Sequence, residues 1–421
     1  MTVPQPYIDF GNTAWVLMST ALVMLMTIPA LALFYGGLVK RKNILSVLMQ
    51  CFAAMSVVSL MWVVVGYSLA FSPGRGVLSG FIGSFDWVLL RHVGFEPSPY
   101  TISQATARIP HLAFMMFQMM FAVITPALII GAFAERMKFS AFLVFTVAWS
   151  LCIYTPIAHM VWASDGILYK LGALDFAGGT VVHISSGMAA LAAALMIGKR
   201  KYLKATPPHN LVFTVIGTAM LWFGWFGFNA GSALAADGLA ASAMVVTHIA
   251  AVGAALTWAG LDWFFHKKPT LLGAATGAVA GLVAITPAAG FVDVSGAIMI
   301  GVLVSFICRF FVVAVKNFFG YDDALDAFGV HGMGGVVGAI ATGFLATPTI
   351  QSAYKGLFYG NPHQVVIQLY AVGISIVYSF VGSLILFKVI DLVIGLRVDD
   401  DEEMMGLDVT EHNERAYTVI E

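Results

Sequence analysis

The sequence predicts an all-α membrane protein that folds as one bundle of transmembrane helices. Hydrophobic residues make up 60% of the 421 residues and charged residues only 10%, whereas soluble domains carry about 25% charged residues. The mean hydropathy is +0.89. Apolar runs of about 20 residues, the length that crosses a bilayer, recur along the whole chain. No polar linker separates them, so one large bundle explains the length better than several soluble domains.

Eleven apolar runs are long enough to be transmembrane helices. They lie near residues 13–35, 44–71, 110–134, 140–161, 177–198, 209–233, 242–265, 271–289, 295–315, 328–346 and 364–394. The first is too long for the core of a signal peptide, so we expect a retained span. Residues 1–394 are therefore expected to form a transmembrane domain, followed by a cytoplasmic tail at 395–421.

The distribution of Lys and Arg predicts the orientation. Cationic clusters follow the first, third, fifth and seventh runs: Lys40–Lys42, Arg136 with Lys138, Lys199–Lys201 with Lys204, and Lys267–Lys268. The connections after the second, fourth and tenth runs hold few cations. Because short cytoplasmic loops are enriched in Lys and Arg, this alternation places the N-terminus outside and the C-terminus inside. The acidic segment Asp399–Glu403 would then be cytoplasmic.

Composition argues against several other classes of protein. A net charge of -1 and a pI near 6.8 exclude a basic nucleic-acid-binding protein. The three cysteines (Cys51, Cys152 and Cys308) lie inside apolar runs, and no Cys or His spacing typical of a metal site occurs. We therefore expect no disulfide framework, no metal or other cofactor, and no enzymatic activity. The 42 glycines instead predict tightly packed helices, as between Gly273 and Gly281.

Two histidines, His183 and His331, lie in apolar, glycine-rich runs, where polar groups are costly and often mark function. These are the fifth and tenth runs. An inverted repeat of runs 1–5 and 6–10 would bring the two histidines together near the membrane midplane. The alternative is that each is a buried histidine hydrogen-bonded to a neighbouring helix. Three further histidines have no such counterpart and are expected to be structural: His111, His159 and His248.

An aspartate precedes each of the two histidines. Asp175 lies at the outer mouth of run 5, where we expect it to cap the helix N-terminus and to favour nearby cations. Asp326 lies at the inner start of run 10, and we expect it to cap that helix. The spacings from Asp175 to His183 and from Asp326 to His331 are unequal, so the internal repeat is weak in sequence.

Aromatic residues gather in three of the runs. Phe117 and Phe121 lie one turn apart on run 3, Trp162 closes run 4, and run 6 carries the segment Trp222–Ser232. An aromatic face attracts a cation without a fixed charge, by up to ~2 kcal/mol when the cation is desolvated. These residues are therefore candidates for a cation-binding mouth.

Together, these segments resemble the Amt/Mep/Rh family, specifically its prokaryotic Amt branch. The matching stretches are Leu33–Gly37 (LFYGG), Pro156–Trp162 (PIAHMVW), Asp175–His183 (DFAGGTVVH), Gly224–Ser232 (GWFGFNAGS), Asp323–Gly332 (DALDAFGVHG) and Gly406–Tyr417 (GLDVTEHNERAY). Each is short, but in this order they are specific, and they cover almost the whole chain. Departures are minor: the stretch between Trp162 and Asp175 is slightly longer than expected, and Asn413 stands where a glycine is expected.

The resemblance implies a homotrimer in the cell (inner) membrane of a prokaryote, with one pore per subunit. It also implies residue roles. The outer recruitment site is formed by Phe117, Trp162, Ser232 and Asp175, and the gate of stacked rings by Phe121 and Phe228. His183 and His331 are the pair of pore histidines, and Trp225 belongs to the pore wall. The tail resembles the region that contacts PII-type signalling proteins, so a PII partner and a regulatory, inter-subunit role are expected for it.

The resemblance implies an ammonium transporter. Carrying a bare ammonium ion through an apolar pore would cost many kcal/mol of desolvation, whereas neutral ammonia crosses easily. We therefore expect the protein to bind ammonium or methylammonium outside, remove a proton near the gate and conduct ammonia. The histidines would relay the proton. Potassium has no proton to lose, which would give selectivity.

Three other functions remain open. The chain could be an ammonium sensor, although the tail carries no appended domain. It could be a passive Rh-like ammonia or carbon dioxide channel, which the aromatic mouth with Ser232 disfavours. It could also be a membrane haem protein, because paired intramembrane histidines bind haem.

Overall fold

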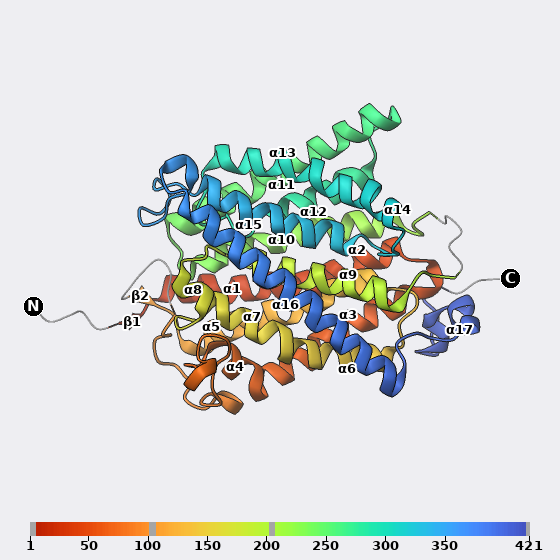
Figure 1. Cartoon of the computed structure of the whole chain (residues 1–421), viewed down its shortest axis with the longest axis horizontal. Helices are drawn as coiled ribbons and strands as arrows, with labels where there is room; N and C mark the ends of the chain where they lie inside the picture. The colour runs from red at the N-terminus through yellow and green to blue at the C-terminus, as the bar shows by residue number, and fades with distance from the viewer. Residues whose placement is uncertain (1–5, 101–106, 202–206, 418–421) are drawn as a thin grey trace, which may run out of the picture.

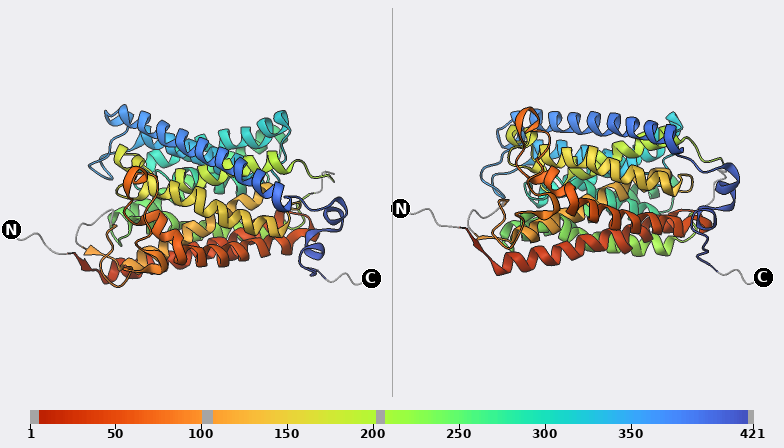
Figure 2. Two further views of the ribbon diagram at one scale, coloured as in Figure 1. Left: turned by 60° about the horizontal axis from the view of Figure 1, so that its bottom comes forward. Right: turned by 90° about the horizontal axis from the view of Figure 1, so that it is seen from below.

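The computed structural model describes residues 6–100, 107–201 and 207–417, so Lys204 and residues 418–421 of the predicted tail lie outside the described residues. Long helices lie side by side along one axis and form a single bundle (Figure 1). One end of the bundle carries a two-stranded parallel sheet of β1 (Tyr7–Ile8) and β2 (Ala107–Arg108). The other end carries the short helix α17 (Asp400–Met405), as the two turned views also show (Figure 2).

Ten helices of the described chain are long and apolar enough to cross a membrane. Five come from the first half of the chain. They are α1, η1 and α2 (Phe10–Leu25, Met26–Leu31, Ala32–Leu38); α3, η3 and α4 (Ile44–Met61, Trp62–Gly66, Tyr67–Phe71); α5 (His111–Phe133); α6, η6, α7 and α8 (Phe139–Trp149, Ser150–Tyr154, Thr155–Trp162, Ile167–Leu171); and η7 with α9 (Gly179–Ile184, Ser185–Ile197). Short 3₁₀ turns lie in the connections: η2 (Arg41–Asn43), η4 (Gly76–Leu78) and η5 (Val88–Leu90).

The other five come from the second half. They are α10 with η8 (Leu211–Ala230, Gly231–Ala233); α11 (Gly238–His266); α13, η9 and α14 (Val294–Arg309, Phe310–Val315, Lys316–Phe319); η10 with α15 (Phe328–Gly332, Met333–Leu345); and α16 (His363–Ile394). A shorter apolar helix, α12 (Leu271–Ile285), lies between α11 and α13 in the chain. A 3₁₀ turn, η11 (Leu357–Tyr359), precedes α16, and α18 (Leu407–Thr410) follows α17.

These ten helices confirm ten of the eleven predicted runs. The remaining run, 271–289, corresponds to α12, which has 15 residues because the chain turns after Ile285. At about 1.5 Å per residue such a helix is shorter than the ~30 Å hydrocarbon core of a bilayer. The count of eleven spans therefore remains a prediction.

Glycines let α12 pack directly on α11. A Cβ atom added at Gly277 would lie 2.6 Å from Trp258 Cβ, and one added at Gly281 would lie 2.5 Å from the carbonyl oxygen of Ala250. Neither position has room for a side chain. The tight packing predicted for this segment is confirmed.

The two segments that carry His183 and His331 open with π-helical turns, η7 and η10. Such turns are rare and often occur at functional sites. The two helices also touch backbone to backbone. A Cβ atom at Gly187 would lie 2.2 Å from Gly332 Cα, and one at Gly335 would lie 2.9 Å from the Gly179 carbonyl oxygen.

The tail packs against the end of the bundle opposite β1. Asp408 Oδ1 accepts a hydrogen bond from the Ser46 N–H (2.9 Å) in the first turn of α3. Lys42 Nζ donates to the carbonyl oxygen of Glu403 (3.1 Å), and Glu403 Oε1 accepts from the Lys201 N–H (2.8 Å). Two of the predicted cationic clusters therefore lie beside the tail at one end of the bundle.

A buried charge cluster lies under this end. Arg200 binds Asp322 with both Nε and Nη2 (2.9 Å each) and Glu135 with Nη1 (2.9 Å). Arg136, fully buried, donates to the Asp322 carbonyl oxygen at 2.5 Å. Burial acts to raise the pKa of the Asp322 carboxyl, but the hydrogen bond and charge of Arg200 and the charge of Arg136 outweigh it and hold this pKa at about 2.

Candidate functional site

The predicted recruitment residues meet at a cavity near the β1 end of the bundle, which we call the wide cavity. It has a volume of about 350 Å³, and its walls include Trp162, Asp175, Ser232 and Phe121. Phe117 is not part of this wall. Its fully buried ring packs edge-on against Phe121, with ring centroids 4.9 Å apart and an interplanar angle of 70°. The structure thus brings three of the four predicted recruitment residues to one cavity, together with the predicted gate residue Phe121, and places Phe117 behind Phe121.

Hydrogen bonds hold two of these side chains. Ser232 Oγ donates to the Phe228 carbonyl oxygen (2.8 Å), which leaves its lone pairs able to accept a hydrogen bond. Trp162 Nε1 donates to the Asp175 carbonyl oxygen (3.0 Å), and the indole ring stands edge-on to Phe121 at 5.8 Å. A cation in the wide cavity would therefore meet aromatic rings and a hydroxyl oxygen.

The Asp175 carboxylate caps the turn that carries His183. Its Oδ1 accepts from the N–H groups of Gly178 (2.9 Å) and Gly179 (2.5 Å). Its Oδ2 accepts from the N–H groups of Thr180 (2.9 Å) and Val181 (3.2 Å), and from the Thr180 hydroxyl. Burial raises the pKa of Asp175, and these hydrogen bonds oppose that shift. The predicted capping role is confirmed.

Two phenylalanine rings close the floor of the wide cavity. Phe121 and Phe228 have ring centroids 4.4 Å apart, inclined at 38°, and both are buried. Phe121 lines the wide cavity, whereas Phe228 lines a narrow cavity beyond it. A molecule that passes from one cavity to the other would have to displace these rings.

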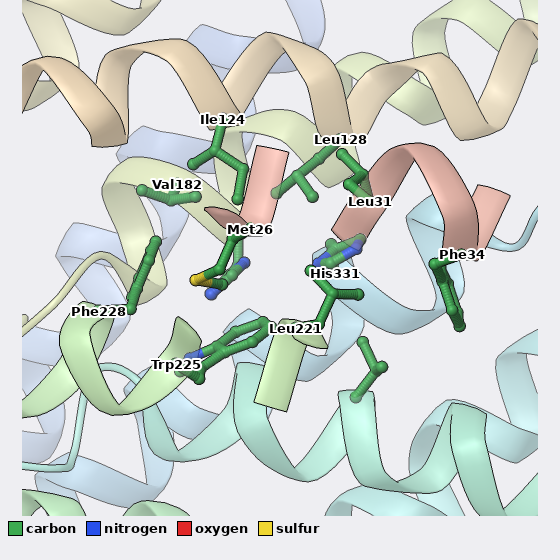
Figure 3. Close-up of a pocket in the computed structure, with 12 residues that line it drawn as sticks. Met26, Leu31, Phe34, Ile124, Leu128, Val182, Leu221, Trp225, Phe228 and His331 are labelled. Carbon is green, nitrogen blue, oxygen red and sulfur yellow. The ribbon is translucent and has the colours of Figure 1, made fainter. Parts of the chain in front are cut away.

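The narrow cavity contains both predicted pore histidines. The rings of His183 and His331 stack at 5.5 Å with an interplanar angle of 18°, and Phe228 stacks on His183 at 6.0 Å. Figure 3 shows His331 between Phe228 on one side and Phe34 on the other. The cavity measures about 10 Å³, close to the smallest space that holds one water molecule. Its other walls are apolar or aromatic: Met26, Leu31, Phe34, Ile124, Leu128, Val182, Leu221, Trp225, Phe228 and Val279.

The histidine rings have free nitrogen atoms. Neither Nδ1 nor Nε2 of His183, nor Nδ1 of His331, has a hydrogen-bond partner within the described part of the chain. The alternative of a histidine hydrogen-bonded to a neighbouring helix therefore does not describe His183. Trp225 stacks on His183 at 5.5 Å, and its Nε1 is occupied by Thr286 Oγ1 (2.9 Å). Among the described side chains that line this cavity, the two imidazoles carry the unpartnered polar atoms, and an imidazole nitrogen can donate or accept a proton.

The capping role predicted for Asp326 is wrong. Asp323 caps η10 instead, with Oδ1 accepting from the Ala327 N–H (3.0 Å) and Oδ2 from the Phe328 N–H (2.8 Å). Asp326 has a positive φ of 61° and forms an ion pair with Lys316 at 2.7 Å. Its left-handed backbone and this ion pair take its carboxylate away from the helix N-terminus.

This correction makes the two halves of the site alike. Asp323 lies eight residues before His331, and Asp175 lies eight residues before His183. Each aspartate caps a π-helical turn that carries the histidine. The Asp-to-His spacings are therefore equal in the two halves when Asp323, rather than Asp326, is taken as the counterpart of Asp175.

A third cavity lies beyond His331, toward the tail. It has a volume of about 230 Å³ and is lined by His331, Tyr35, Arg200 and Asp326, among others. His331 lines both this cavity and the narrow one, and the ring contact between Phe121 and Phe228 links the narrow cavity to the wide one.

The histidines expected to be structural line none of these cavities. His111 Nε2 lies 2.6 Å from Tyr67 Oη, and the ring nitrogens of His159 lie 3.0 and 2.9 Å from the carbonyl oxygens of Ala70 and Ser79. The ring of His248 packs against Trp222, with centroids 5.3 Å apart. Among the described residues, no group of three or more His, Cys, Asp or Glu side chains could hold a metal ion. The haem hypothesis also fails on space, because a cavity of about 10 Å³ between stacked imidazoles cannot admit a porphyrin.

Sequence reasoning left two glutamines without a role. Gln118 lines the wide cavity, and its Oε1 has no partner among the described residues. Gln368 is fully buried in α16. The signal for both was present, since each is a polar residue inside a long apolar run.

Residues 14–417 match a family model described as "Ammonium Transporter Family". A curated relative, "Ammonium transporter" of Bacillus subtilis, is 50% identical over 410 residues, which cover 97% of this chain and 99% of the relative.

Two solved structures share the fold. The crystal structure of Saccharomyces cerevisiae Mep2 superposes with a TM-score of 0.86 and 35% identity, covering 94% of this chain and 89% of that one. A structure described as "Sensor Amt Protein" superposes with a TM-score of 0.87 and 30% identity, covering 96% of this chain and 98% of that one.

Proposed function

Since this chain belongs to the ammonium transporter family, we propose that it recruits ammonium outside the cell, removes one proton and conducts ammonia through the narrow cavity. The observation that carries this mechanism is the column of rings Phe121, Phe228, His183 and His331. In that column, imidazoles with free nitrogens lie directly beneath a closed pair of phenylalanines.

Recruitment takes place in the wide cavity. The Ser232 hydroxyl oxygen accepts an N–H of the ion, and the rings of Trp162 and Phe121 offer π-faces. Phe117 supports Phe121 from behind, and the buried Asp175 favours positive charge nearby. Methylammonium carries the same N–H donors and binds in the same way.

Deprotonation follows from the size and polarity of the narrow cavity. It has room for about one small molecule and is walled by hydrocarbon and by Trp225. A hydrated cation cannot enter it, and a bare cation would pay a large desolvation cost. Ammonia can pass and hydrogen-bond to His183 and then His331. A free ring nitrogen of His183 accepts the proton and the two histidines relay it, so each ammonium ion delivers one positive charge.

The histidine pair arises from an inverted repeat of helices 1–5 and 6–10, in a bundle of eleven spans. The matched Asp-to-His spacings support this arrangement, as do Gly187 and Gly335, each four residues after its histidine and each packed against the other helix. The N-terminus lies outside and the C-terminus in the cytoplasm. The tail and its neighbouring cationic clusters at one end of the bundle support this orientation.

The protein works as a homotrimer in the cell (inner) membrane, with a pore in each subunit, as a transporter rather than an enzyme. The chain consists of a transmembrane domain (residues 1–394) and a regulatory tail (residues 395–421). The tail's contacts with the first turn of α3 and with Lys201 support regulation by a PII-type partner, which would displace or hold the tail.

A sensor role is the second candidate, favoured by the likeness to the protein described as "Sensor Amt Protein". A sensor would bind ammonium in the wide cavity and conduct little. Transport measurement separates the two roles.

The test is ammonium-driven current and methylammonium uptake in proteoliposomes that contain the wild-type protein, His183→Ala, or His183→Ala with His331→Ala. We expect wild type to carry ammonium and exclude potassium, and the double variant to lose that discrimination. Discrimination that is unchanged without both histidines would overturn the deprotonation mechanism. Wild type that binds ammonium but carries no current or uptake would favour the sensor.

A further inference from the structure

Gln368 is a buried amide on a helix that is otherwise largely exposed. The next residues of α16, Leu369 and Tyr370, are 50% and 61% exposed, whereas Gln368 is 0% exposed. A polar side chain inside a membrane helix is costly unless it finds partners, and such residues tend to be functional. The residues that satisfy this amide therefore indicate its role.

Four hydrogen bonds satisfy the amide, three of them with the backbone; the fourth is donated to Oε1 by Gln364 Nε2 (3.4 Å). Oε1 accepts from the Leu174 N–H (2.7 Å), and Nε2 donates to the Leu174 carbonyl oxygen (2.8 Å). Gln368 thus pairs with both backbone groups of one residue, as a neighbouring β-strand would. The second Nε2 hydrogen is donated to the Ala339 carbonyl oxygen on α15 (2.9 Å).

The surroundings are shaped for this side chain. A Cβ atom at Gly343 of α15 would lie 3.0 Å from Gln368 Cγ, so the glycine leaves room for it. One turn earlier on α16, Gln364 Nε2 donates to the Gly172 carbonyl oxygen (3.0 Å). Two glutamines of one helix therefore hold the segment from Gly172 to Leu174, which has no regular secondary structure of its own.

We propose that Gln368 is a positioning residue for cation recruitment, an inference that rests on the proposed function. Leu174 directly precedes Asp175, whose carboxylate caps η7 and whose carbonyl oxygen receives the Trp162 indole N–H. By holding Leu174, Gln368 sets where Asp175 and Trp162 stand in the wide cavity. Through Ala339 it also ties this wall to α15, the helix that continues from His331.

The effect of losing this amide follows from which contacts remain. Asp175 still caps η7 through its own carboxylate, so the histidine stack keeps its support. The Leu174 N–H and carbonyl oxygen lose their partner, and the recruitment wall relaxes. Ion binding should therefore weaken while conduction through the narrow cavity continues.

The test compares Gln368→Met, which keeps the length of the side chain and removes all its hydrogen bonds, with Ser379→Ala. Ser379 is a matched control because it is fully buried on the same helix and its hydroxyl has no partner in the described structure. Methylammonium uptake is measured in proteoliposomes over a range of concentrations. We expect KM to rise about tenfold in Gln368→Met, the effect of losing one strong hydrogen bond, with Vmax unchanged, and neither to change in Ser379→Ala.

A second variant covers a failure of Gln368→Met to fold. Gly343→Ala leaves the glutamine in place, but its added Cβ atom would lie 3.0 Å from both Gln368 Cγ and Val365 Cα, so it displaces the glutamine together with its stretch of α16 and should also raise KM. A KM that stays at the wild-type value in the folded variant, or a fall in Vmax at constant KM, would show that Gln368 only supports packing. If wild type itself shows neither uptake nor ammonium current, the proposed function fails, and with it the inference. Saturable wild-type uptake with an unchanged KM in the variants overturns the inference alone.

Discussion

At the scale of single residues, the polar groups of the wide and narrow cavities differ in their capacity to donate and accept hydrogen bonds. In the wide cavity, Ser232 Oγ already donates its hydrogen to the Phe228 carbonyl oxygen, so toward a ligand it can act only as an acceptor. An acceptor suits ammonium, which has only N–H donors. In the narrow cavity, the free nitrogens of His183 can donate or accept, which suits ammonia.

This contrast predicts the effect of Ser232→Ala. The variant removes a hydrogen-bond acceptor for a cation, a contact that contributes about 1.5–3 kcal/mol. We expect the KM for methylammonium to rise by tenfold or somewhat more, at roughly constant Vmax, in proteoliposome uptake. A drop in Vmax at unchanged KM would instead mean that the hydroxyl serves only to hold the Phe228 backbone.

The two aspartates near His331 provide a second test at this scale. Asp323 caps η10, whereas Asp326 faces the tail-side cavity and pairs with Lys316. Removing a helix cap costs about 1 kcal/mol. We expect Asp323→Ala to lower the thermal unfolding midpoint in detergent clearly more than Asp326→Ala does. Equal shifts would contradict the assignment of the cap to Asp323.

Residue types were easier to predict from sequence than residue partners. A histidine in an apolar run is costly enough to be noticed without a structure, and both histidines of the narrow cavity were found that way. Gln368 gave the same signal, but its partner Leu174 lies 194 residues away in the chain. Contacts at that separation depend on how the helices pack, which hydropathy does not describe.

At the scale of helices, the close approach of the two histidine-bearing segments depends on glycine. Gly187 contacts the backbone of Gly332, and a Cβ atom there would overlap Gly332 Cα at 2.2 Å. The two helices would have to separate to accept any side chain. Their separation sets the distance between the histidine rings, now 5.5 Å.

Gly187→Ala should therefore impair both stability and transport. Forcing an extra methyl group into a packed interface costs about 1–3 kcal/mol, and we expect a lower unfolding midpoint and slower methylammonium uptake. Gly373→Ala on α16 is the control, because a Cβ atom there would have no neighbour within 4 Å. That change should leave uptake unchanged. Normal uptake by Gly187→Ala would show that the histidine spacing tolerates helix movement.

Helix positions were predicted well and their exact boundaries less so. Lipid requires long apolar helices, so ten runs matched ten observed helices closely. The helix α12 was overestimated because Thr286–Phe291 remain apolar after the chain has turned. Hydropathy measures how apolar a segment is, so it does not distinguish a helix from an apolar turn that stays buried inside the bundle.

At the scale of the whole molecule, one network of contacts joins the tail to the start of η10. Glu403 in the tail binds Arg397 Nη2 (2.6 Å) and the Lys201 N–H, and the neighbouring Arg200 binds Asp322. Asp322 precedes the aspartate that caps η10. Contacts therefore run from the tail through the basic loop to the start of the helix that carries His331.

The charge cluster in this network predicts how stability depends on acid. The pKa of Asp322 is about 2 in the folded protein, below its ordinary value of 3.8. A carboxyl whose folded pKa is depressed stabilises the fold above its unfolded pKa, and that contribution disappears as the pH falls from about 4 to about 2. The depression corresponds to about 2 kcal/mol.

Asp322→Asn should therefore be less stable than wild type at pH 5, by an amount that shrinks toward pH 2. Unfolding midpoints of both proteins in detergent, measured between pH 2 and pH 5, check this. Asp323, whose pKa burial raises to about 7 in the folded state, titrates in the same way in both proteins, so its contribution cancels in the comparison. A gap between the two proteins that stays constant down to pH 2 would mean that Arg136 stabilises this end of the bundle through carbonyl oxygens, and Arg200 through Glu135, rather than through the charge of Asp322.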